Sequence, residues 1–98
     1  MPRSHGPTDA EDAERRAELL LSLRQRGMRD LTLLRAMETV PRSRFVPDEL
    51  AEHAYSDQAL PIACGQTISQ PSLVALMTEQ LAVNDRHKVL EIGTGSGY

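Results

Sequence analysis

The sequence has little of several features that mark whole classes of protein. It contains no tryptophan, and aromatic residues make up 3% of its 98 positions. So few aromatic side chains argue against the base-stacking surface of a single-strand-binding protein. The net charge is −3, and the 11 basic residues are scattered among 14 acidic ones. We therefore expect no nucleic-acid partner.

A second cysteine, paired histidines and long apolar runs are also lacking. Cys64 is the single cysteine, so an internal disulfide is excluded, and without a basic neighbour we expect it to be a packed residue. His5, His53 and His87 have no companion at ligand spacing, which predicts no metal site. No apolar run approaches the roughly 20 residues of a membrane span, and no signal-peptide core follows the N-terminus. We expect a protein of the reducing cytoplasm without membrane contact.

What the sequence does contain is an ordinary globular balance, with 40% hydrophobic and 26% charged residues. This length allows one small domain with a modest core. Residues 1–7 contain two prolines, a glycine and a serine without apolar periodicity, which predicts a disordered tail. We assign residues 8–98 to part of a single domain.

The first strong helix signal begins at Thr8. Thr8 and Glu11 have the spacing of a capping box, and Gly27 is placed to end the helix. Acidic residues in the first turns and basic residues in the last suit the helix dipole. The expected apolar side of this helix consists of Ala13, Ala17, Leu20, Leu21 and Leu23.

Two more helices are indicated further along the chain. Asp30 can cap a helix from Leu31 to about Thr39, and Pro41 ends it. Pro71 suits the first position of a third helix, whose apolar residues share one face. These residues are Leu73, Leu76, Met77 and Leu81.

The region between these helices has weaker signals. Residues 41–47 are expected to form an extended connector, followed by a short helix that begins at Pro47 and continues to His53. In residues 54–71 apolar and polar residues alternate irregularly, and proline and glycine are present, so we expect a loop with short strand pieces.

A glycine loop closes the sequence. Residues 88–92 predict a short buried strand of the parallel type, which runs into Gly93-x-Gly95-x-Gly97. Glycines let the backbone turn sharply and approach a ligand closely. Tyr98 stands where a dinucleotide fingerprint needs its third glycine, and the Gly-Lys-Ser/Thr of a phosphate loop is missing. A cofactor loop and a plain glycine-rich turn after a core strand both remain open.

The segment from Gly65 to Pro71, Gly-Gln-Thr-Ile-Ser-Gln-Pro, also has two interpretations. Ser69 or Gln70 can simply cap the helix that Pro71 begins. A catalytic nucleophile is not indicated, because Ser69 has no nearby base and no Gly-x-Ser-x-Gly elbow is present.

The glycine loop, preceded by an acidic residue, resembles motif I of S-adenosylmethionine-dependent methyltransferases. In the same chain, "AMETVPRSRFVP", "AYSDQALPI", "GQTISQPSLVALMTEQL" and "VLEIGTGSGY" follow one another at close spacing. Together, over residues 27–98, these segments resemble the N-terminal part of the protein-L-isoaspartate O-methyltransferase family. The resemblance implies an α/β, Rossmann-like fold, of which this chain would hold the N-terminal helical cap and the first sheet strand only.

The resemblance also implies site residues. Ser69 matches the active-site serine, and Thr67 and Ile68 belong to the same loop facing substrate and cofactor. The implied S-adenosylmethionine site consists of Thr67, Ile68, Ser69, Glu91, Gly93, Gly95 and Gly97. No metal is implied.

The activity implied is methyl transfer to the free carboxylate of L-isoaspartyl residues, and of D-aspartyl residues as an extension, in damaged proteins and peptides. We expect a monomer at full length. Because the later strands of such a sheet are missing, we expect the 98-residue chain alone to be inactive. A non-catalytic helical binding module derived from the same family is the alternative, and the coding sequence downstream of Tyr98 would separate the two.

Overall fold

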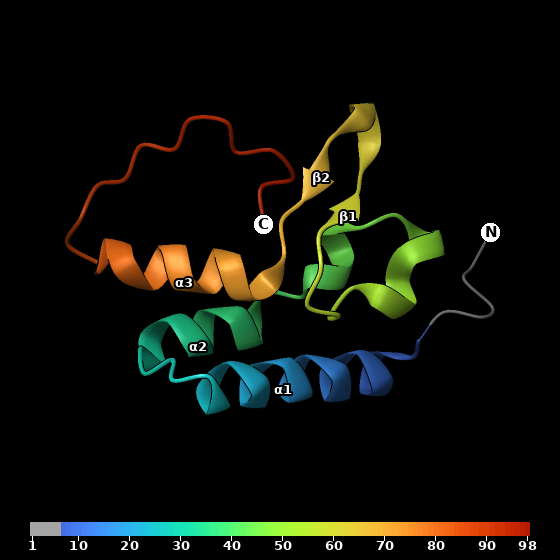
Figure 1. Cartoon of the computed structure of the whole chain (residues 1–98), viewed down its shortest axis with the longest axis horizontal. Coiled ribbons are helices and arrows are strands. Elements are labelled where there is room, and N and C mark those ends of the chain that lie inside the picture. Colours follow the sequence, from blue (N-terminus) through green and yellow to red (C-terminus); the bar gives the residue numbers. More distant parts are fainter. Residues whose placement is uncertain (1–6) are drawn as a thin grey trace.

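Figure 1 shows the arrangement of the chain in a computed structural model that describes residues 7–98. The predicted tail at residues 1–7 therefore lies almost wholly outside the described residues. In chain order the elements are α1 (Asp9–Gln25), α2 (Leu31–Thr39), the 3-10 helices η1 (Arg42–Phe45) and η2 (Asp48–His53), β1 (Leu60–Pro61), the 3-10 turn η3 (Ala63–Gly65), β2 (Thr67–Ile68) and α3 (Pro71–Leu81).

The limits of α1 confirm the capping signals. The Thr8 hydroxyl accepts a hydrogen bond from the Glu11 backbone N–H at 3.1 Å, and the Glu11 carboxylate accepts the Thr8 N–H at 3.4 Å. Gly27 follows the helix with φ +104°, a conformation that glycine adopts without cost. The capping box and the glycine stop therefore act as the sequence predicts.

The predicted apolar side of α1 is wrong in part. The buried residues are Leu19 and Leu23, whereas Leu21 is 57% exposed. Three consecutive leucines at positions 19–21 offer the helix more than one apolar stripe. Only the neighbouring elements decide which stripe is buried.

The helix α2 lies between α1 and α3 (Figure 1). Asp30 caps it as predicted, since its carboxylate accepts the Leu33 N–H at 3.1 Å. The turn joining α1 to α2 is tied to α3 by Glu79, whose carboxylate accepts the backbone N–H groups of Arg29 and Asp30 at 3.1 and 3.0 Å. The three helices are thus connected by specific hydrogen bonds as well as by apolar packing.

A short antiparallel hairpin of β1 and β2 confirms the predicted strand pieces. Leu60 pairs with Ile68, and both side chains are buried, with 5% and 2% exposure. At the hairpin tip Cys64 is exposed and has φ +63°, so the prediction of a packed cysteine is wrong. The hairpin and the helices share one core, made up of Leu19, Leu23, Leu34, Met37, Val46, Ala54, Tyr55, Leu60, Ile68 and Ala75.

Two predicted conformations differ from the structure. Residues 41–47 are not extended throughout, because η1 occupies the middle of this segment. Residues 88–92 form no strand, and there Leu90 and Ile92 are 85% and 89% exposed. A parallel strand needs neighbouring strands to receive its backbone hydrogen bonds, and the described residues supply none beside this segment.

The predicted apolar face of α3 is present but lies in solvent. Leu73, Leu76, Met77 and Leu81 are 47 to 66% exposed, while Pro71 and Ala75 on the other side are buried. Across residues 7–98 no helix combines the length and apolar character needed to cross a membrane.

Candidate functional site

Ser69 occupies a two-residue link between β2 and α3. It is exposed, and its hydroxyl forms no hydrogen bond with any of residues 7–98. The N-cap position of α3 is Gln70, which makes no side-chain capping bond. The capping interpretation of Ser69 is therefore wrong, and the fold leaves its hydroxyl available.

The helix α3 is instead capped by a residue distant in sequence. Asp57 accepts the Ser72 backbone N–H at 2.8 Å and the Gln70 side-chain amide at 3.2 Å. Arg26, at the end of α1, donates to the same carboxylate at 2.6 Å. Burial by itself raises the pKa of Asp57, but the hydrogen bonds from Ser72, Gln70 and Arg26 outweigh it and lower the pKa to about 2.

This lowered pKa predicts a pH dependence of stability. Because the folded pKa of Asp57 is about 2 against an ordinary 3.8, its contribution is present above pH 4 and is lost as the pH falls toward 2. Because one pKa unit corresponds to 1.36 kcal/mol, the contribution is at most about 2.4 kcal/mol. Urea unfolding of the 98-residue chain between pH 2 and 5 measures it.

A substitution distinguishes the contribution of Asp57 to this pH dependence from the contributions of the other carboxylates. Asp57→Asn should remove about 2 kcal/mol of stability at pH 5 and flatten the profile below pH 4. Asp85→Asn, in an exposed turn, removes the same charge and should leave the profile unchanged. An Asp57→Asn profile parallel to that of the parent chain would contradict the assignment.

A buried arginine ties the C-terminal end of the chain to the rest. Arg42 is completely buried, and its guanidinium donates to the backbone oxygens of Ala54 at 2.6 Å and Gln58 at 3.3 Å. It also lies 5.1 Å from the ring centroid of Tyr98, which in turn packs edge-on against Phe45 at 5.5 Å. Burial lowers the pKa of Arg42 and raises that of Tyr98.

The contacts of Tyr98 place the end of the glycine loop against the helices. Its ring lines a cavity of about 140 Å³ with residues of α2 and with Val74 and Thr78 of α3. Figure 1 shows the C-terminal end of the chain returning to the region of β2 and the start of α3. Tyr98, at the end of the glycine loop, and Ser69, shortly before Pro71, therefore both lie next to α3.

The glycine loop has the backbone that its residue types suggest. Gly93, Gly95 and Gly97 have φ of +72°, +61° and +84°, all in the left-handed region. A Cβ atom added at any of the three would meet no protein atom within 4 Å. The Thr94 hydroxyl donates a hydrogen bond to the Glu91 carboxylate across the turn. The glycines are therefore needed for the turn itself, while the space around them is open.

These residues are compatible with the cofactor that the sequence suggests. A bare, open loop backbone permits the close approach of a ligand, and the nearby Glu91 carboxylate is exposed and can accept hydrogen bonds from an ammonium or a hydroxyl group. Thr67 is exposed as well, whereas the Ile68 side chain is buried in the core. A role of Ile68 toward a ligand would therefore involve its main chain.

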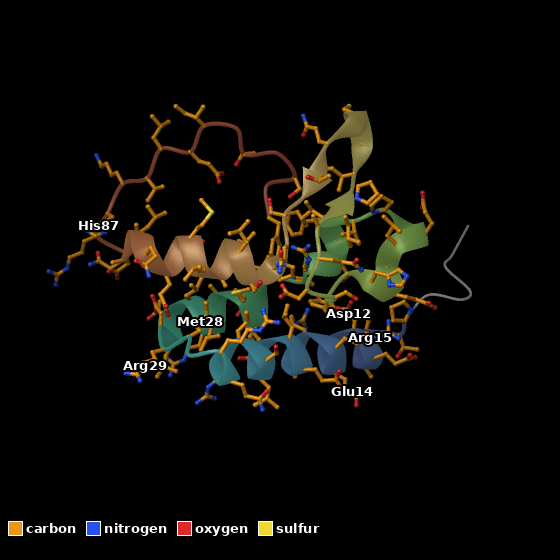
Figure 2. All side chains as sticks on the ribbon, in the orientation of Figure 1. Asp12, Glu14, Arg15, Met28, Arg29 and His87 are labelled. Carbon is orange, nitrogen blue, oxygen red and sulfur yellow. The ribbon has the colours of Figure 1, made fainter. Side chains whose placement is uncertain are left out.

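His87 is not placed to act as a base for Ser69. His87 lies beyond the C-terminal end of α3 (Figure 2), and Ser69 precedes the other end. Eleven helical residues separate them by about 16 Å at 1.5 Å per residue. Among residues 7–98 no group of three or more His, Cys, Asp or Glu side chains is arranged to hold a metal ion.

Sequence reasoning missed Asp57 and Arg42. Neither is close in sequence to the residues it contacts: Asp57 precedes Ser72 by 15 positions, and Arg42 precedes Ala54 by 12. A weak signal was available for Asp57, since Pro71 has no N–H and Gln70 is a poor cap, which leaves the Ser72 N–H in need of an acceptor. For Arg42 no signal separates it from the other ten basic residues.

Comparison with known proteins identifies the family of the chain. The protein-L-isoaspartate(D-aspartate) O-methyltransferase family matches residues 14–98. A protein-L-isoaspartate O-methyltransferase of Azorhizobium caulinodans is 69% identical over 91 residues, which are 93% of this chain and 42% of that protein. One of Xanthobacter autotrophicus is 63% identical over 95 residues, 97% of this chain and 43% of that protein.

A third relative, from Cereibacter sphaeroides, is 58% identical over 91 residues, 92% of this chain and 42% of that protein. The class of protein indicated by all these matches is a methyltransferase. The chain belongs to the protein-L-isoaspartate(D-aspartate) O-methyltransferase family. It spans about two fifths of the length of the curated relatives that it matches.

Proposed function

We propose that this chain is part of an enzyme that methylates the free carboxylate of L-isoaspartyl residues, and of D-aspartyl residues, in damaged proteins. S-adenosylmethionine is the proposed methyl donor. The complete domain would have a Rossmann-like fold, in which residues 88–92 form a strand once neighbouring strands are present. The exposed apolar residues of 88–92 and of α3 support this, because such surface is normally buried. We propose a monomer at full length, acting in the cytoplasm.

The observation that supports the proposed chemistry most directly is the Ser69 hydroxyl, exposed and without a partner among residues 7–98. A hydroxyl can donate a hydrogen bond to a substrate carboxylate and orient it. Since a carboxylate is already ionised at neutral pH, the reaction needs no strong general base, which fits a Ser69 hydroxyl without a hydrogen-bond partner among residues 7–98. Catalysis would depend mainly on alignment of donor and acceptor.

S-adenosylmethionine would supply an electrophilic methyl group on a sulfonium centre. Glu91 and the backbone of Gly93, Gly95 and Gly97 would hold its methionine part, and Thr67, Ile68 and Ser69 would line the side facing the substrate. A carboxylate oxygen of the substrate would take the methyl group as its bond to sulfur breaks, which gives a methyl ester and leaves the cofactor as a neutral thioether. The main-chain nitrogen that follows would then attack this ester and release methanol to form a succinimide. Water reopens the succinimide partly as normal aspartate, so that the net outcome is repair.

The test uses a completed enzyme, defined as residues 1–98 joined to the remaining C-terminal part of the Azorhizobium caulinodans relative. We expect it to methylate an isoaspartyl peptide and to leave the matching normal aspartyl peptide unmodified. The C-terminal part alone, which lacks Ser69 and the glycine loop, is the control and should be inactive. A folded completed enzyme that binds S-adenosylmethionine but methylates neither peptide would contradict the proposal.

The 98-residue chain by itself is expected to bind S-adenosylmethionine weakly or not at all. In the structure the glycine loop is exposed on the side where a ligand would lie, so little surface is available to enclose the adenosine part. Isothermal titration calorimetry of the chain and of the completed enzyme, under the same conditions, measures the difference. Micromolar affinity of the chain alone would show that the loop and the Ser69 segment suffice.

A further inference from the structure

The position of Ser69 is determined by what holds the chain on either side of it. On the N-terminal side Ile68 pairs with Leu60 in the hairpin, and its side chain is 2% exposed. On the C-terminal side α3 begins at Pro71, which is itself fully buried. Only Ser69 and Gln70 lie between these two anchored points.

The C-terminal anchor depends on Asp57. Pro71 has no N–H, so the Ser72 N–H is the first backbone donor of α3, and Asp57 accepts it at 2.8 Å. The same carboxylate accepts the Gln70 side-chain amide at 3.2 Å, and that amide also donates to the Ser72 hydroxyl at 3.1 Å. Asp57 therefore holds Gln70, the residue directly after Ser69, by the Gln70 side chain. It holds the first turn of α3 by the Ser72 backbone N–H.

The contact of Asp57 with Arg26 is different in kind. It joins the carboxylate to α1 at 2.6 Å, and the Arg26 side chain is 56% exposed, against 20% for Asp57. An exposed ion pair of this type contributes little to stability or to position. The bonds from Gln70 and Ser72 are partly buried, and the Ser72 N–H has no other acceptor among the described residues.

We propose that Asp57 is a positioning residue for Ser69: by holding Gln70 and the start of α3, it sets the direction in which the Ser69 hydroxyl faces the substrate carboxylate. This inference rests on the proposed function of Ser69. Asp57 itself touches neither substrate nor cofactor, so it acts only through the link formed by Ser69 and Gln70.

The experiment combines Asp57→Asn with Ser69→Ala in the completed enzyme. An asparagine keeps one acceptor oxygen but presents an N–H group to donors that the carboxylate accepts. At a temperature well below the melting point, we expect Asp57→Asn to lower kcat about tenfold and to change the Kd for S-adenosylmethionine less than threefold. In the Ser69→Ala background the same change should lower kcat less than twofold, because the group that it positions is already gone.

Two matched controls and a structural readout accompany these variants. Arg26→Gln removes only the exposed partner of Asp57, and Asp85→Asn removes an unrelated negative charge; both should keep kcat within twofold. Hydrogen exchange at the Ser72 amide should be at least tenfold faster in Asp57→Asn than in the parent, since its acceptor is weakened.

The outcomes separate this inference from the function on which it rests. An equal loss of kcat in the parent and Ser69→Ala backgrounds would show a general structural role and overturn the inference. Unchanged kcat, or unchanged Ser72 exchange, in Asp57→Asn would overturn it as well. A parent enzyme that binds cofactor but does not methylate an isoaspartyl peptide would instead contradict the proposed function.

Discussion

In the completed enzyme, Gly95→Val is expected to abolish binding of S-adenosylmethionine, with a Kd raised at least hundredfold. Gly95 has φ +61°, and a Cβ there meets no protein atom within 4 Å. The isopropyl group would therefore enter the open space in front of the loop, where the cofactor is proposed to approach the backbone. The left-handed conformation adds about 1–2 kcal/mol of strain for a residue other than glycine. Calorimetric titration of the folded variant measures the loss.

Backbone strain must be separated from obstruction of the ligand. Gly27→Val is the control, because Gly27 also has a positive φ, +104°, with open space around it, at the end of α1. It should lower the melting temperature and leave cofactor affinity within threefold. If Gly95→Val folds and binds cofactor like the parent, the loop is an ordinary turn and not a cofactor site.

Ser69→Ala in the completed enzyme should lower methyl transfer to an isoaspartyl peptide by more than tenfold. This corresponds to a barrier increase above about 1.4 kcal/mol. The free energy of unfolding should change by less than about 0.5 kcal/mol, because the hydroxyl has no partner in the fold, whereas a true N-cap serine contributes about 1 kcal/mol. Cofactor affinity should change much less than the rate, since the lost hydrogen bond is to substrate.

A thermal melt and a methylation assay with saturating peptide measure the two quantities independently. Ser22→Ala, in the last turn of α1, is the control for loss of one serine hydroxyl and should keep full activity. A Ser69→Ala variant that is destabilised by about 1 kcal/mol and fully active would return Ser69 to a structural role.

Local signals in the sequence were sufficient for most of the elements. The capping box at Thr8 and Glu11, the cap at Asp30 and the proline at position 71 each act within three or four residues, and the helices that they predict are present. The same holds for the glycine loop, whose three glycines all have positive φ. Such features depend on backbone stereochemistry and nearest hydrogen bonds, which a short stretch of chain determines alone.

Most of the predictions that failed concern features that depend on contacts with other elements. Residues 88–92 have the composition of a buried strand, yet a strand exists only where a neighbour receives its hydrogen bonds. The buried stripe of α1 depended in the same way on the elements that lie against it, and Cys64 proved exposed at a hairpin tip.

The limits of the helices, the glycine turn and the family to which the motifs point could all be predicted from the sequence. That Ser69 caps nothing could not, because the acceptor for the start of α3 is Asp57, 15 positions earlier than Ser72. The burial of Arg42, which donates to the backbone oxygens of Ala54 and Gln58, likewise depends on tertiary contacts. Contacts between residues far apart in sequence arise from packing of the whole chain, and no local pattern specifies them.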